Sequence, residues 1–79
     1  MKFDHTLDTR GLLCPEPVMM LHAAVRKLGA GEVLQMRATD PSTQRDVAKF
    51  CQFLGYELVQ HLEEDDEFIY WIKKAGPDA

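Results

Sequence analysis

A stripe of large apolar residues constrains the fold of this chain more than any other feature of the sequence. Its members recur at intervals of three and four residues, as one side of an α-helix requires: Val18, Leu21, Val25 and Leu28, with Ala24 beside them. Gly29 and Gly31 follow, and glycine accepts the left-handed backbone conformation that ends many helices. We therefore predict an amphipathic helix over residues 16–28 that needs a second layer to cover its apolar side.

Segments in which apolar and polar residues alternate lie on both sides of this helix, and a period of two is typical of a strand with one face on the core. We predict strands over residues 3–8 and 32–39. In the first, Phe3 and Leu7 share a side. In the second, the core side carries Leu34, Met36 and Ala38.

Two further strands are predicted over residues 56–62 and 67–73. The four acidic residues 63–66 lie between them and suit an exposed hairpin turn. On the last strand we expect the inward side to carry Phe68, Tyr70 and Ile72. Ile69 and Trp71 would then take the outer, solvent-facing side of the sheet, where they either cover it or meet a partner.

A second helix is predicted to start at Asp40 and Pro41, with the aspartate as N-cap and the proline at the first helical position. Its apolar side would carry Val47, Phe50, Cys51 and Leu54. Gly55 then ends it. The order strand, helix, strand, helix, strand, strand predicts two helices packed on one face of a four-stranded mixed sheet.

The 79 residues suit one domain spanning residues 1–79, in which Ala75 to Ala79 form a frayed tail. The net charge of −4 and the scattered basic residues argue against direct binding to nucleic acid. No apolar run approaches the roughly 20 residues of a membrane span, and the N-terminus lacks the pattern of a secretion signal. We expect a cytoplasmic protein that does not bind a membrane.

The two cysteines differ in their surroundings. Cys51 lies within an apolar stripe, where a buried thiol acts as a small hydrophobic group. Cys14 precedes the first helix, where backbone amides and the helix dipole would favour its thiolate and lower its pKa. Pro15 and Pro17 fit the first helical turn and would stiffen the segment that presents this thiol.

A catalytic cysteine usually needs a histidine within hydrogen-bond reach, and none is indicated here. His22 would lie about 12 Å along the helix from Cys14, at about 1.5 Å per residue. The spacing of cysteines and histidines predicts no metal site, and we expect no cofactor. Met19 and Met20 would form a soft apolar rim near the thiol, either as a protein contact or merely as exposed methionines.

Two stretches together resemble the TusA/SirA family of small sulfur-carrier proteins: LDTRGLLCPEPVMM and ATDPSTQRDVAKFCQFLGYELV. The Cys-Pro-x-Pro motif comprises Cys14, Pro15, Glu16 and Pro17, and an Asp-Pro pair opens the second helix. The resemblance implies an α/β two-layer sandwich. It also implies that Cys14 carries sulfur as a persulfide, acting between partner proteins rather than as a stand-alone enzyme.

The resemblance further implies two partners: a pyridoxal-phosphate cysteine desulfurase as sulfur donor, and a downstream relay protein as acceptor. The expected pathway is 2-thiolation of the tRNA wobble uridine; the alternatives are molybdenum cofactor assembly, another sulfur pathway, or a non-catalytic regulatory module. Family members carry arginine where this chain has Leu13 and His22. The expected partner contacts are Met19, Met20, His22, Asp40 and Arg45.

Overall fold

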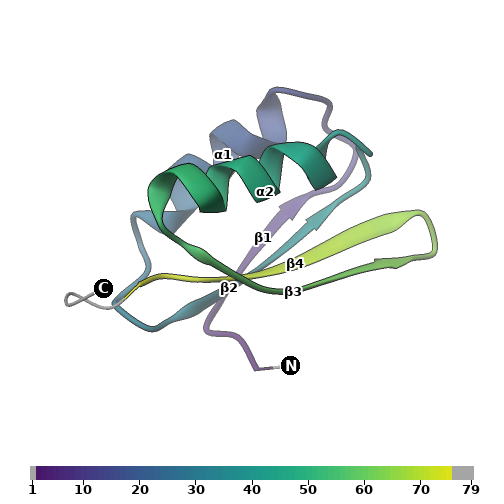
Figure 1. Cartoon of the computed structure of the whole chain (residues 1–79). Helices are drawn as coiled ribbons and strands as arrows, with labels where there is room; N and C mark the ends of the chain where they lie inside the picture. The colour runs from purple at the N-terminus through teal and green to yellow at the C-terminus, as the bar shows by residue number, and fades with distance from the viewer. Residues whose placement is uncertain (1, 76–79) are drawn as a thin grey trace.

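Six regular elements follow one another in the computed structural model, which describes residues 2–75. They are β1 (His5–Thr9), α1 (Glu16–Val25), β2 (Val33–Ala38), α2 (Thr43–Leu54), β3 (Glu57–Glu64) and β4 (Glu67–Lys73). Both helices cover the same face of the sheet, and the opposite face carries none (Figure 1). The predicted element order and two-layer α/β fold are therefore confirmed.

The sheet is mixed, with the strand order β1-β2-β4-β3. β1 pairs with β2 in parallel, while β4 pairs antiparallel with both β2 and β3. The α1 crossover allows the parallel pair, and a tight turn allows the antiparallel hairpin. As a result β2 and β4 lie in the middle and supply most of the sheet's contribution to the core.

The core lies between the sheet and the two helices. The predicted inward residues of β2 and β4 are all buried, and from the helices Leu21 and Val47 have no exposed surface. One prediction for α2 is wrong, because Leu54 is 50% exposed. Its neighbour Phe53, for which no side was predicted, is 77% exposed. The last turn of α2 therefore presents apolar side chains to solvent.

Helix α1 ends three residues earlier than the apolar stripe predicts. After Val25 the backbone tightens, because the amides of Lys27 and Leu28 bond to carbonyls only three residues back, of Ala24 and Val25. Leu28 is still only 3% exposed. The stripe identified the buried residues correctly but not the end of the helix.

Helix α2 begins at Thr43 rather than at Asp40. Asp40 instead forms a turn, since its carboxylate accepts the amide of Ser42 and its carbonyl accepts the amide of Thr43. Asp40 is therefore not the N-cap, which is Ser42. The predicted stop at Gly55 is confirmed, with a φ of 77° in the left-handed region.

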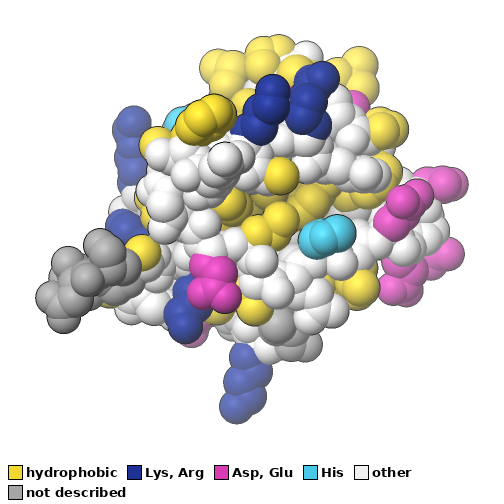
Figure 2. All heavy atoms as spheres, viewed as in Figure 1, with side chains coloured by type: hydrophobic (Ala, Val, Ile, Leu, Met, Phe, Trp, Pro, Cys, Tyr) yellow, Lys and Arg dark blue, Asp and Glu magenta, His cyan; other side chains and the backbone are white. Residues whose placement is uncertain are grey.

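The turn between β3 and β4 is shorter than the acidic run suggests. β3 continues to Glu64, and only Asp65 and Asp66 remain in the turn, with φ values of 52° and 63°. Two successive positive φ values match the hairpin turn whose twist suits antiparallel strands. Acidic side chains gather at one end of the molecule in Figure 2.

The outer face of the sheet is not exposed to solvent at every position. Trp71 is directed to that face, as predicted, but it is only 5% exposed. Its cross-strand neighbours are Gln35 and Gln60, and its indole Nε1 has no hydrogen-bond partner within residues 2–75. A large aromatic ring is thus buried on the face of the sheet that carries no helix.

Within residues 2–75, no helix is long and apolar enough to cross a membrane. Of the predicted tail, Ala75 is partly buried, and residues 76–79 lie outside the described part of the chain.

A buried hydrogen bond attaches the start of α2 to the sheet. The hydroxyl of Thr43 donates to the carbonyl of Asp40 at 2.7 Å, which leaves the hydroxyl of Tyr70, at 2.9 Å, to donate to Thr43. We predict that Tyr70→Phe lowers the free energy of unfolding by about 1 kcal/mol, measured by urea denaturation. Tyr56→Phe is the control, and an equal effect of both variants would contradict the prediction.

Candidate functional site

Two loops meet at one edge of the sheet and form the candidate site. Because β1 and β2 are parallel, the segments that follow them leave from the same edge. The first segment carries Cys14, and the second carries Asp40. The amide of Gly11 also donates to the hydroxyl of Thr39 at 2.9 Å, which ties the two loops together.

The carboxylate of Asp40 holds both loops. It accepts the amide of Cys14 at 2.7 Å, the amide of Ser42 at 3.0 Å and the hydroxyl of Ser42 at 2.8 Å. The bonds from Ser42 and Cys14 lower the pKa of this carboxyl. The backbone that presents the cysteine is therefore anchored by an ionised side chain from the neighbouring loop.

The proline pair supports the same segment in two different ways. Pro15 is exposed and is the N-cap of α1, so it lies one residue before the first helical turn in which it was predicted. Pro17 lies within the first turn, as predicted, and is fully buried. Glu16 is exposed. One proline thus anchors the segment to the core while the other stays at the surface beside Cys14.

Cys14 is exposed, but its thiol does not lie in a positive environment. Its Sγ donates to Oδ2 of Asp46 at 3.3 Å. This hydrogen bond is the main reason that the pKa of Cys14 is raised; desolvation and the charges of Asp46 and Asp40 add to it, against a lowering contribution from Ser42. The predicted lowering of the pKa by the helix dipole is wrong, because carboxylates face the sulfur.

Cys51 has the structural role that its place in the sequence predicted. It is 4% exposed within the core, and burial raises the pKa of its thiol to about 11. Its sulfur is therefore a neutral hydrophobic group at neutral pH.

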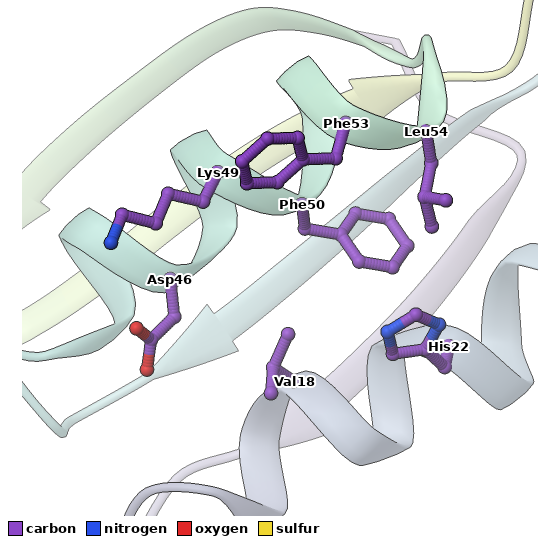
Figure 3. A pocket seen from close by; sticks show the side chains of 7 residues that line it. All are labelled: Val18, His22, Asp46, Lys49, Phe50, Phe53 and Leu54. Atoms are coloured by element: carbon purple, nitrogen blue, oxygen red, sulfur yellow. The ribbon is translucent and has the colours of Figure 1, made fainter.

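A pocket of about 260 Å³ lies between the two helices. Its lining comes from both of them: Val18, His22, Asp46, Lys49, Phe50, Phe53 and Leu54. In Figure 3 the rings of Phe50 and His22 approach each other, and Asp46 projects from α2 into the space between the helices. The two ring centroids are 4.7 Å apart in an edge-to-face arrangement. His22 therefore packs on an aromatic ring of α2.

The remaining predicted residues occupy different parts of this surface. Asp40 is beside Cys14, as described above. Arg45 is connected to the thiol only indirectly, since its Nε donates to Oδ1 of Asp46 at 3.1 Å. Met19 and Met20 are 61% and 38% exposed on α1. No hydrogen bond links either methionine, or His22, to Cys14.

The sequence reasoning missed Asp46 and Phe53. A signal for Asp46 was present, because parallel strands bring the start of α2 to the same edge as Cys14. The first turn of α2 was therefore the place to look for a partner of the thiol. No comparable signal distinguished Phe53, since an aromatic residue on an amphipathic helix is more often buried.

Among the described residues, no three His, Cys, Asp or Glu side chains lie close enough together to hold a metal ion.

The fold and the site place this chain in a class of small two-layer α/β proteins that carry an exposed cysteine just before the first helix. A solved structure shares this fold. The chain is similar to the crystal structure of a SirA-like protein from Desulfitobacterium hafniense, with a TM-score of 0.76 and 30% identity. The alignment covers 92% of this chain and 99% of that one.

Residues 5–74 match the family described as Sulfurtransferase TusA. The chain is 61% identical over 73 residues to the sulfur carrier protein TusA of Pseudomonas putida strain GB-1, covering 92% of this chain and 91% of that protein. It is 59% identical to the corresponding protein of Pseudomonas aeruginosa strain LESB58, covering 92% of each. The chain belongs to the TusA family, and the resemblance noted in the sequence is confirmed.

The anchoring role of Asp40 predicts a pH-dependent effect on stability. Its native pKa lies below the ordinary 3.8, so the ionised carboxylate stabilises the fold at pH values above 3.8. That contribution is lost as the pH falls through the native pKa. We expect Asp40→Asn to lower the free energy of unfolding near neutral pH, and the difference from wild type to shrink below the ordinary pKa.

Urea denaturation at a series of pH values measures this difference. Asp65→Asn removes the same charge from the exposed hairpin turn and is the matched control. A difference between Asp40→Asn and wild type that does not change with pH would contradict the role of the carboxylate.

Proposed function

We propose that this protein is a sulfur carrier that accepts sulfane sulfur as a persulfide on Cys14 and passes it to another protein. The observation that carries the proposal is the placement of Cys14. Its sulfur is exposed, and its backbone is held from the adjacent loop by Asp40. A thiol presented in this way enters the active site of a partner at a small cost in ordering entropy.

The transfer itself is a thiol exchange. The sulfur of Cys14 attacks the outer sulfur of a persulfide on the donor and leaves the donor with its thiol, while Cys14 becomes Cys14-S-SH. The reverse roles apply when the carrier delivers sulfur to its acceptor. The reaction needs a partner that carries a persulfide and needs access to the sulfur of Cys14. The exposure of Cys14 provides that access.

We propose a pyridoxal-phosphate cysteine desulfurase as donor and a sulfur-relay protein as acceptor, with 2-thiolation of the tRNA wobble uridine as the pathway and the cytoplasm as the location. Relatives at about 60% identity, named sulfur carrier protein TusA, support the role of carrier. Exposed apolar side chains support a protein partner: Leu13, Met19 and Phe53 are 71%, 61% and 77% exposed.

Leu13 is an exposed apolar side chain, and His22 packs on the ring of Phe50. The surface combines apolar residues with Lys49 at the pocket. We propose that it discriminates among partners through apolar packing more than through charge.

The persulfide is tested directly by intact-mass spectrometry. After incubation with a cysteine desulfurase and L-cysteine, we expect a gain of one sulfur, about 32 Da, which reducing agent removes. Cys14→Ser abolishes the gain, and Cys51→Ser leaves it because that thiol is buried. Sulfur carried on Cys51, or on neither cysteine, would refute the carrier role.

The pathway is tested by the 2-thiouridine content of tRNA in a strain that lacks the gene. We expect thiolation to fall in the deletion strain, wild-type protein to restore it, and Cys14→Ser to leave it low. Normal thiolation in the deletion strain would favour molybdenum cofactor assembly or another sulfur pathway. Full complementation by Cys14→Ser would favour a regulatory module in which the cysteine has no chemical role.

A further inference from the structure

The side chain of Asp46 is held against the sulfur of Cys14. It belongs to the first turn of α2, and its side chain is 19% exposed. One carboxylate oxygen lies 3.3 Å from Sγ, and the other accepts a hydrogen bond from Nε of Arg45 at 3.1 Å. The carboxylate is therefore oriented from both sides and directed at the atom that would carry the sulfur.

The charged groups around this thiol are mainly acidic. Asp46 faces it from α2 and Asp40 from the preceding loop, while Glu16 lies in the first turn of α1. Arg45 pairs with the oxygen of Asp46 that points away from the sulfur. His22 and Lys49 line the pocket that Asp46 shares, but neither bonds to the thiol. The resting group is therefore a neutral thiol that donates to a carboxylate.

We propose that Asp46 is a catalytic residue of sulfur transfer: it accepts the hydrogen bond of the Cys14 thiol in the resting carrier, and it accepts the thiol proton when the sulfur attacks. The proposal rests on the proposed function. It gives the carrier its own proton acceptor, in contrast to an isolated thiol that depends on its partner for every catalytic group.

The proposed step is balanced without an added oxidant or reductant. The bond between Sγ of Cys14 and the outer sulfur of the donor persulfide forms as the sulfur–sulfur bond of the donor breaks. The electron pair of the broken bond leaves with the donor thiolate. The proton of Cys14 passes to Asp46 and then to that thiolate, which restores the carboxylate.

Asp46→Asn distinguishes a proton-accepting role of Asp46 from a merely electrostatic one. If Asp46 accepts the proton, the substitution should speed alkylation of Cys14 but slow sulfur transfer. Removing the negative charge favours the thiolate and speeds alkylation. A tenfold rise in the thiolate fraction comes with a lower pKa, and a thiolate of lower pKa is about threefold less nucleophilic. The alkylation rate should therefore rise by about threefold for each tenfold rise in thiolate fraction. The amide cannot accept the proton, so sulfur transfer should slow by at least about tenfold, within the range of general base catalysis.

The experiment compares four proteins in two assays: wild type, Asp46→Asn, Asp46→Glu, and Asp65→Asn as a charge-matched control on the hairpin turn. The first assay measures the rate of alkylation by iodoacetamide across a pH series. The second measures single-turnover loading from a cysteine desulfurase supplied with L-cysteine, by intact mass. We expect Asp46→Asn to alkylate faster at a lower pH midpoint yet load more slowly.

Asp46→Glu retains a carboxylate and should recover part of the loading rate, and Asp65→Asn should match wild type in both assays. Alkylation and loading that rise together in Asp46→Asn would show that the carboxylate only suppresses the thiolate, and would overturn the proposal. Unchanged rates in both assays would also overturn it. Asp46→Glu decides the question if Asp46→Asn does not fold, since a Glu variant with no loading at all contradicts a proton-accepting carboxylate.

The loading assay distinguishes a failure of the proposed carrier function from a failure of the proposed role of Asp46. Wild-type protein that accepts no sulfur overturns the proposed function, and the role of Asp46 with it. Wild-type protein that loads at the same rate as Asp46→Asn overturns the role of Asp46 alone and leaves the carrier function intact.

Discussion

The hydrogen bonds that converge on the carboxylate of Asp40 are the constraint on which the site depends. One side chain binds the backbone of Cys14 and, through Ser42, the segment that leads into α2. The parallel pairing of β1 and β2 makes this possible, since it brings both loops to the same edge. The position of the sulfur relative to α2 therefore follows from the topology of the sheet as well as from the Cys-Pro-x-Pro motif.

Stiffness and reactivity come from different parts of this arrangement. Asp40 and the buried Pro17 fix the backbone around Cys14, whereas Asp46 acts on the sulfur itself. Placement before a helix is often enough to make a cysteine acidic. Here the hydrogen bond to Asp46 is the main reason that the pKa of Cys14 is raised, which favours the neutral thiol in the free protein. Such a thiol suits a carrier, because it reduces reactions with sulfur compounds other than those offered by a partner.

The sequence predicted the layers of the fold well because hydrophobic periodicity reports burial directly. Leu34 and Met36 on β2 and Leu21 on α1 are buried as expected. Element ends were predicted less well, since the start of α2 depends on the turn at Asp40. At the site, Cys14 was singled out by its place before the first helix and Asp40 by the family resemblance, but Asp46 was not, because which helix residue faces a distant loop depends on tertiary packing.

Trp71 adds a property unrelated to sulfur chemistry. It is the only tryptophan in the chain, it is almost fully buried, and it lies on the face of the sheet that carries no helix. The inter-helix pocket belongs to the opposite layer. We therefore expect the fluorescence of Trp71 to report the integrity of the sheet more than the docking of a partner over the helices.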